Sequence, residues 1–172
     1  MESVSSIENK EVLKGIITDF KQLTKVGLSV SVVFTSITGY LLATDVIDYN
    51  VILQLAIGGY LMVGASNAFN QVIEKDIDAL MQRTKNRPLP SGRMKASTAL
   101  TIATVFTIAG IAILYSINPK CALFGAISIF LYTSAYTPLK QITPLAVFVG
   151  AIPGAIPYMF CLLYTSPSPR DS

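Results

Sequence analysis

A short charged segment, residues 67–92 (NAFNQVIEKDIDALMQRTKNRPLPSG), holds the side chains best suited to chemistry in this chain. Asn70, Glu74 and Asp78 follow one another at four-residue steps, each of which turns a helix by about 40°, so their oxygens share one face. Mg²⁺ prefers oxygen ligands and is usually held by one or two carboxylates together with substrate phosphates. The spacing therefore predicts a Mg²⁺ site in which Glu74 and Asp78 supply carboxylates and Asn70 is a neutral ligand or an orienting hydrogen-bond partner. The polar residues expected to extend this stripe back into the apolar run are Asn67, Asn70 and Gln71.

Basic residues follow at Arg83, Lys85 and Arg87, ahead of Pro88 and Pro90, which are expected to stop the helix. Such cations neutralise the outer oxygens of a diphosphate, and Arg does so through a bidentate fork. Together with Mg²⁺ they stabilise the charge that develops as a diphosphate leaves. The segment is therefore expected to bind a diphosphate. The alternative is that these charges merely end a membrane span and are solvated.

The composition indicates that this segment belongs to a membrane protein. Of the 172 residues, 52% are hydrophobic and 13% charged, whereas a soluble domain has about 25% charged residues. A helix that crosses a bilayer needs about 20 mainly apolar residues. Five runs meet this need, at residues 26–44, 51–73, 97–116, 121–137 and 145–163. We therefore predict an all-α fold, a polytopic transmembrane helical bundle.

The N-terminal segment, residues 1–25, shows no apolar core or cleavage site of a signal peptide. After a polar start, its apolar residues recur at helical spacing among lysines, which predicts an amphipathic helix on the membrane surface. Eleven basic residues lie in this segment and in the 74–96 and 138–144 loops. The loops expected on the opposite side of the membrane, 45–50 and 117–120, contain one. The positive-inside rule therefore predicts a cytoplasmic N-terminus.

Several classes of site are excluded by composition. The chain has no His, which removes Ser–His and Cys–His nucleophile pairs, zinc-protease motifs and His-ligated haem from this sequence. Cys121 and Cys161 lie in apolar runs and indicate neither a disulfide framework nor a metal site. No glycine-rich phosphate loop is present, and no nucleic-acid partner is expected.

The run NQVIEKDID resembles the first acidic motif of the UbiA superfamily of intramembrane prenyltransferases, written NDxxDxxxD. Asn70, Glu74 and Asp78 occupy motif positions, but Gln71 replaces an Asp and Glu74 replaces the central Asp. DIDALMQRTKNRPLPSGRM and YTPLKQITPLAVFVGAIPGAIP resemble the protohaem IX farnesyltransferases, the haem O synthase branch, over about residues 15–160. The chain would then be about five spans of a larger UbiA-type bundle in the cell membrane.

This resemblance implies Mg²⁺-dependent transfer of a farnesyl group from farnesyl diphosphate to a vinyl group of haem b, which gives haem O. Besides the lipid bilayer, it implies haem-handling or oxidase-assembly proteins as partners. Quinone-precursor or chlorophyllide acceptors remain open. So do a transporter with a cation-coordinating polar stripe, which the charges at one interface disfavour, and a structural membrane subunit.

The second cytoplasmic segment, YTPLK, ends in Lys140, which is predicted to reach the diphosphate or a haem propionate, or else to anchor the loop. Tyr132 and Tyr136 are expected either to face the substrate cavity or to pack at the membrane interface. Gly150 and Gly154 form a GxxxG pair, which predicts close helix contact.

Residues 161–172, CLLYTSPSPRDS, resemble the in-frame translation of a transposase adapter used in DNA library preparation, so they are not expected to belong to the fold. Residues 26–160 are then expected to form part of a prenyltransferase domain. Members of the resembled family carry a second acidic motif that completes a two-metal site, and none follows Asp78 outside this tail. The chain is therefore predicted to be an N-terminal piece of a longer enzyme and to be inactive alone.

Overall fold

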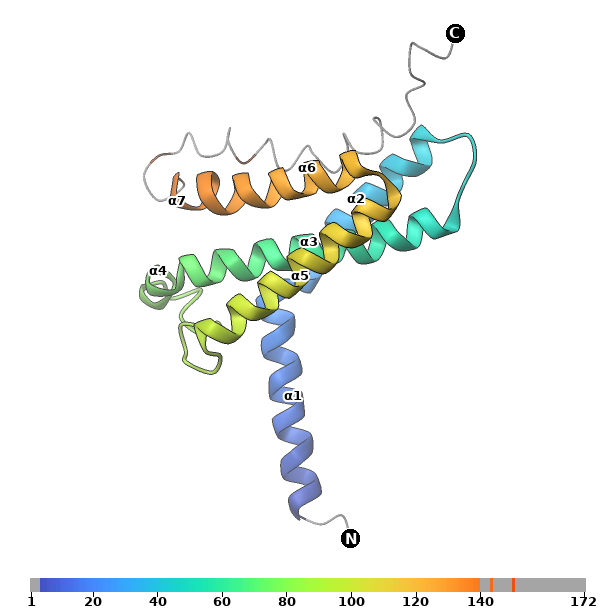
Figure 1. The fold of residues 1–172 in the computed structure, drawn as a ribbon. Helices are drawn as coiled ribbons and strands as arrows, with labels where there is room; N and C mark the ends of the chain where they lie inside the picture. Colours follow the sequence, from blue (N-terminus) through green and yellow to red (C-terminus); the bar gives the residue numbers. More distant parts are fainter. Residues whose placement is uncertain (1–3, 140–142, 144–149, 151–172) are drawn as a thin grey trace.

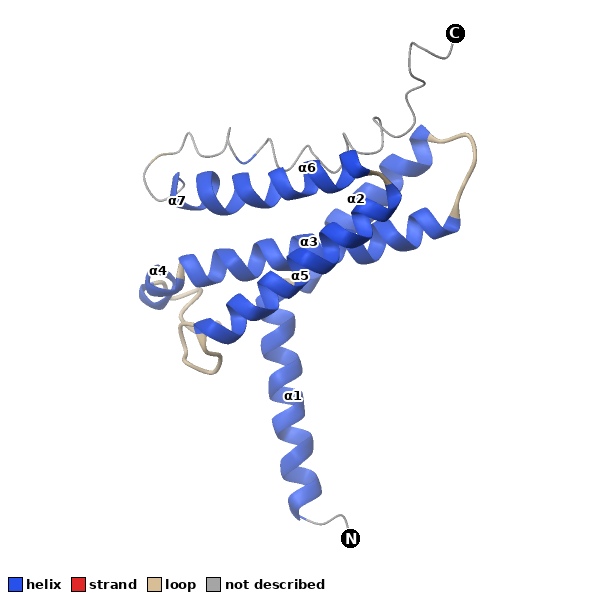
Figure 2. Ribbon diagram, viewed as in Figure 1, coloured by secondary structure: helices blue, strands red, loops and turns tan. Residues whose placement is uncertain are grey.

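The computed structural model describes residues 4–139 together with Thr143 and Gly150, and all of its regular elements are helical (Figures 1 and 2). The elements are α1 (Val4–Thr24), α2 (Val26–Ala43), α3 (Tyr49–Ile73), α4 (Lys75–Leu80), α5 (Ala96–Ile117), α6 (Pro119–Phe130), the π-helical η1 (Leu131–Tyr136) and α7 (Thr137–Leu139). The described residues contain no strand, which confirms the all-α prediction.

Three helices, α2, α3 and α5, are long and apolar enough to cross a membrane. They match the first three expected spans. α6, η1 and α7 follow without a break over the fourth expected span, 121–137. The fifth expected span, 145–163, lies outside the described residues except for Gly150. The described part of the chain is therefore a bundle of membrane-length helices.

α3 is the central helix and packs against α1, α2, α5 and α6. The close approach of α3 to α5 depends on small residues, as is common between membrane helices. A Cβ at Gly110 would lie 2.8 Å from the sulfur of Met62, and one at Gly58 would lie 3.1 Å from the Leu114 side chain. The packing forms two buried apolar clusters. One contains Tyr40, Val51, Leu55, Met62, Leu114, Cys121 and Ala122. The other contains Leu23, Ala68, Leu89, Ala99 and Ala103.

α1 projects away from this bundle, and its axis crosses those of α3 and α5 (Figure 1). Its C-terminal end packs against the bundle: Leu23 is fully buried, and the ring of Phe20 meets that of Phe106 edge-on at 5.9 Å. Nearer the N-terminus of α1, an apolar face is exposed; it is formed by Val12, Leu13, Ile16 and Ile17. A helix is therefore present where the amphipathic helix is predicted, and its place on a membrane surface stays a prediction.

Candidate functional site

The acidic residues lie where α3 passes into α4. Glu74 (φ −93°, ψ 4°) interrupts the regular helix, but the chain keeps its helical hydrogen bonds. The N–H of Glu74 donates to the Asn70 carbonyl at 3.0 Å, and the N–H of Asp78 donates to the Glu74 carbonyl at 2.8 Å. Asn70, Glu74 and Asp78 therefore occupy successive turns, as the spacing predicts, and the exposed Asp76 lies off their face.

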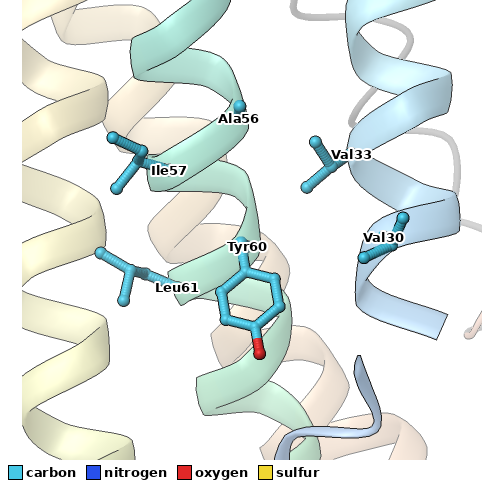
Figure 3. A pocket seen from close by; sticks show the side chains of 6 residues that line it. All are labelled: Val30, Val33, Ala56, Ile57, Tyr60 and Leu61. Atoms are coloured by element: carbon cyan, nitrogen blue, oxygen red, sulfur yellow. The ribbon is translucent and has the colours of Figure 1, made fainter. Parts of the chain in front are cut away.

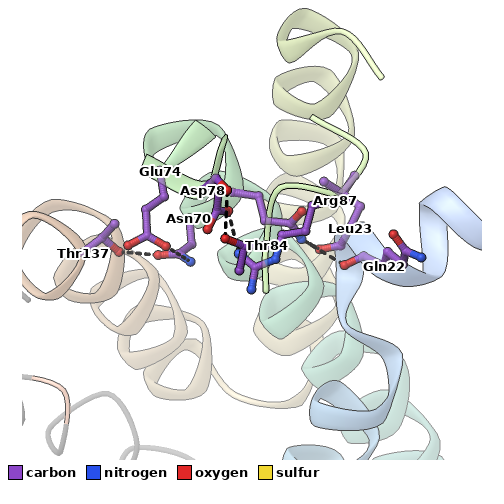
Figure 4. A network of polar contacts seen from close by, with 9 residues as sticks. Gln22, Leu23, Asn70, Glu74, Asp78, Thr84, Arg87 and Thr137 are labelled. Carbon is purple, nitrogen blue, oxygen red and sulfur yellow. Dashed lines mark hydrogen bonds and ion pairs between the residues drawn. The ribbon is translucent and has the colours of Figure 1, made fainter. Parts of the chain in front are cut away.

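Asn70 joins the acidic segment to α7 (Figure 4). Its Nδ2 donates to Oε2 of Glu74 at 2.9 Å, while its Oδ1 accepts a hydrogen bond from the Thr137 hydroxyl at 3.0 Å. Asn70 and Thr137 are buried, and Glu74 is half-buried. The amide thus holds the carboxylate of Glu74, and α7 holds the amide.

Asp78 is held from the other direction, by the loop that follows α4. Its carboxylate pairs with the guanidinium of Arg87 at 2.6 Å, and its carbonyl accepts from the Thr84 hydroxyl at 2.9 Å (Figure 4). Of the three basic residues on this loop that are predicted to meet a diphosphate, the structure thus brings only Arg87 to the acidic stripe. Arg83 and Lys85 are exposed on the same loop.

The expectation that Pro88 and Pro90 stop the helix is wrong, because α4 already ends at Leu80. Along a continuous helix Arg87 would lie about 13 Å beyond Asp78. The loop instead turns back, which buries Pro88 and Leu89 and lets Arg87 reach the carboxylate. The tertiary contacts of this loop therefore outweigh its helical potential.

The structure also corrects the expected extension of the polar stripe. Gln71 and Asn67 face α1, where Nε2 of Gln71 donates to the carbonyls of Gln22 and Leu23 at 2.9 and 2.8 Å. Nδ2 of Asn67 donates to the Thr24 carbonyl at 3.3 Å. These bonds cap the C-terminal end of α1, whose carbonyls lack helical partners. A carboxylate at position 71 could not donate them, so the amide suits this contact.

Two carboxylates and an amide on successive turns are a donor set that suits Mg²⁺ shared with phosphate oxygens. Among the residues that the structure describes, no cluster of three or more acidic or Cys side chains could hold a metal ion by itself. A metal held by Asn70, Glu74 and Asp78 would therefore need further oxygen ligands, such as those of a phosphate.

The remaining predicted contacts lie on η1 and beyond it. The rings of Tyr132 and Tyr136 are 5.1 Å apart. A Cβ at Gly150, the first glycine of the predicted pair, would lie 2.7 Å from the ring of Tyr136. Lys140 and Gly154 lie outside the described residues.

An apolar cavity of about 350 Å³ lies between α2 and α3, apart from the acidic residues (Figure 3). Its lining residues are Val30, Val33, Ala56, Ile57, Tyr60 and Leu61. The lining carries no charged side chain, and its one hydroxyl, on Tyr60, lies 3.3 Å from that of Thr24. The cavity therefore suits hydrocarbon and not a diphosphate.

Sequence reasoning missed two residues of this region. The sequence places Gln71 in the polar stripe and as the replacement of an Asp, although Asn67 and Gln71, four residues apart, mark a polar face of their own. Thr137 was passed over between Tyr136 and Lys140. Its hydroxyl at the end of an apolar run was the available signal, but its partner is 67 residues away in sequence.

Comparison with known proteins gives one family and one fold. The model of the UbiA prenyltransferase family matches residues 32–170. Protoheme IX farnesyltransferase of Flavobacterium psychrophilum is 63% identical over 159 residues, which are 91% of this chain and 53% of that protein. The protein of the same name from Christiangramia forsetii is 65% identical over 84% of this chain and 48% of its own length. The chain thus spans about half the length of these curated relatives.

Proteins of lower sequence identity match the same family and fold. Human mitochondrial protoheme IX farnesyltransferase is 41% identical over 79% of this chain and 31% of its own length. A solved UbiA homolog from Archaeoglobus fulgidus, bound to DMAPP and Mg²⁺, superposes with a TM-score of 0.76 at 15% identity, over 87% of this chain and 55% of that one. This match confirms the helical bundle fold.

Proposed function

The chain belongs to the UbiA prenyltransferase family, and we propose that its acidic site serves the transfer of a farnesyl group from farnesyl diphosphate to protohaem IX. The acceptor carbon belongs to a vinyl group of the porphyrin, and the product is haem O. The names of the bacterial relatives and of the human one support this choice of substrates. The observation that carries the proposal is the pair of carboxylates, Glu74 and Asp78, on successive turns at the end of a membrane-length helix.

We propose that Glu74 and Asp78 hold Mg²⁺, with Asn70 as a third ligand or as the group that orients Glu74. The DMAPP and Mg²⁺ bound to the solved UbiA homolog support a metal-held diphosphate. When bound, the metal neutralises the negative charge that the leaving diphosphate develops. The chain's own residues hold the reacting diphosphate in place, so its departure needs little reorganisation.

Arg87 is proposed to divide its guanidinium between Asp78 and the diphosphate, since it has five N–H donors and one carboxylate uses at most two of them. Arg83 and Lys85, exposed on the same loop, would meet the outer oxygens of the diphosphate. Lys140 is proposed to approach from the second cytoplasmic segment. This division assigns the inner position to the cation that the structure places beside the carboxylate of Asp78.

We also propose that the protein lies in the cell membrane with its N-terminus in the cytoplasm, and that α1 lies on the membrane surface. The exposed apolar face of α1 and its direction across the bundle support this placement (Figure 1). The acidic site would then open toward the cytoplasmic headgroups, where a water-soluble diphosphate and a membrane-borne tail can be held together. Haem-handling or oxidase-assembly proteins would meet the enzyme on this side.

The test is haem O formation in a haem O-deficient strain by the longest reading frame that contains this sequence. Wild-type protein should restore haem O, and Glu74→Gln should abolish the restoration at equal protein level. Consumption of farnesyl diphosphate without haem O would redirect the proposal to a quinone precursor or chlorophyllide. Turnover that needs no Mg²⁺ would contradict the metal-held diphosphate.

A further inference from the structure

We propose that Thr137 is a positioning residue that fixes the amide of Asn70 and, through it, the carboxylate of Glu74. The inference rests on the proposed function, because it assigns a task within the same site. Thr137 comes from α7, whereas Asn70 and Glu74 come from the end of α3. The arrangement therefore joins the two cytoplasmic segments through a hydrogen-bonded chain of three side chains.

In this series of hydrogen bonds, each side chain donates to the next, from Thr137 through Asn70 to Glu74. The hydroxyl of Thr137 donates to Oδ1 of Asn70 at 3.0 Å, and Nδ2 of Asn70 donates to Oε2 of Glu74 at 2.9 Å. Turning the amide over would place its oxygen against the carboxylate of Glu74, which repels it. Thr137 and Asn70 are 0% and 2% exposed, so water does not compete for these bonds. Each side chain therefore limits the rotation of the next.

The backbone around Thr137 is built to deliver this hydroxyl. Leu131–Tyr136 form a π-helical turn, in which the N–H of Thr137 donates to the carbonyl of Tyr132, five residues earlier. The wider turn rotates the residues that follow relative to an α-helix. Pro138 has no N–H, so it leaves the Ser134 carbonyl without the usual donor four residues later, a local cost that a wide turn accommodates. Insertions of this kind are frequent at functional sites.

Thr137 also donates to the Tyr132 carbonyl at 2.7 Å, so its proton is shared between a backbone and a side-chain acceptor. The backbone bond fixes the rotamer of Thr137, and the fixed hydroxyl then fixes Asn70. Without the hydroxyl, the Asn70 amide loses the hydrogen bond that its oxygen accepts from α7. Glu74 would then sample more rotamers, and fewer of them would suit a metal and diphosphate.

The test uses three substitutions at Thr137 in the longest reading frame that contains this sequence. Thr137→Val keeps the shape and removes the hydroxyl, Thr137→Cys keeps the volume with a weak donor, and Thr137→Ser keeps the hydroxyl. The matched control is Thr133→Val, one turn earlier, because the Thr133 hydroxyl donates only to backbone carbonyls of its own helix. The readout is the Mg²⁺ concentration that gives half-maximal farnesyl transfer, measured together with the unfolding midpoint of each variant.

Thr137→Val and Thr137→Cys should raise the half-saturating Mg²⁺ concentration about three- to tenfold, the effect of one lost neutral hydrogen bond. Thr137→Ser and Thr133→Val should match the wild type. An unchanged Mg²⁺ requirement in the Val and Cys variants overturns the proposal, and so does an equal loss of rate in all three variants without a shift in the Mg²⁺ requirement, which indicates packing alone. A wild-type protein that transfers no farnesyl group overturns the proposed function instead.

Discussion

The carboxylate of Asp78 lies 2.6 Å from the guanidinium of Arg87, nine residues later in the chain, and the pair closes the loop that follows α4. The side chain of Asp78 is 5% exposed and that of Arg87 is 25% exposed. The sequence assigns these residues separate tasks, one to a metal and one to a diphosphate. The structure makes them one unit, so substitution of either residue affects both the fold of the loop and the charge of the site.

Removing the cation should therefore destabilise the protein. Arg87→Gln leaves a buried carboxylate without its partner, and we expect a loss of about 1–3 kcal/mol in the free energy of unfolding. Arg83→Gln is the matched control, because Arg83 is exposed on the same loop, and a change within about 0.5 kcal/mol is expected. Chemical unfolding in detergent measures both. Equal effects of the two substitutions would contradict a structural role for the ion pair.

The two carboxylates of the site should be distinguishable from their neighbour by activity. Glu74→Gln and Asp78→Asn each remove a negative charge from the proposed metal site, and we expect farnesyl transfer to fall about 100-fold or more. Asp76→Asn should retain nearly full activity, since Asp76 is exposed and lies off the shared face. Haem O produced per unit of protein is the measurement. Activity of Glu74→Gln close to that of the wild type would refute the assigned site.

Gln71 offers a test of how α1 is attached. Gln71→Glu replaces two donated hydrogen bonds with a carboxylate that faces the carbonyls of Gln22 and Leu23, so we expect a loss of about 2–3 kcal/mol. Hydrogen exchange at the C-terminal end of α1 should speed up in parallel. Gln82→Glu, at an exposed position, introduces the same charge and should leave both readouts unchanged. Protection of α1 that survives Gln71→Glu would show that its attachment depends on other contacts.

The close approach of α3 and α5 can be tested with a single methyl group. In Gly110→Ala the new Cβ would lie 2.8 Å from the Met62 sulfur and 3.3 Å from the Gly58 carbonyl oxygen. We expect a loss of about 1–3 kcal/mol, typical of overpacking. Gly15→Ala meets nothing within 4 Å on α1 and should stabilise the protein by about 0.5–1 kcal/mol. Thermal unfolding midpoints that move in opposite directions are the expected outcome.

Much of the fold could be read from local patterns. The expected spans at 26–44, 51–73 and 97–116 agree with α2, α3 and α5, because a membrane helix satisfies its backbone hydrogen bonds within one segment and needs only a sufficient apolar run. The alignment of Asn70 and Glu74 was equally predictable, since residues four apart share a helix face. Both are properties of short stretches of sequence.

The partners of these side chains could not be read in the same way. The sequence predicts that the helix continues past Asp78 to the prolines. It ends at Leu80 instead, and the loop that follows turns back, buries Pro88 and pairs Arg87 with the carboxylate of Asp78. Where the helix ends depends on the balance between hydrogen bonds within one segment and contacts with other helices. The spacing of residues in the sequence carries no information about contacts with other helices.

The sequence by itself determined the class of the protein, the positions of the three membrane-length helices α2, α3 and α5, and the face on which Asn70, Glu74 and Asp78 lie. Each follows from helical periodicity or from hydrophobicity, which act over a few turns. Only the tertiary structure decided that Gln71 caps α1, that Arg87 neutralises Asp78, and that Thr137 holds Asn70. These are contacts between buried polar groups, whose partners are set by which segments the packing of the bundle brings together.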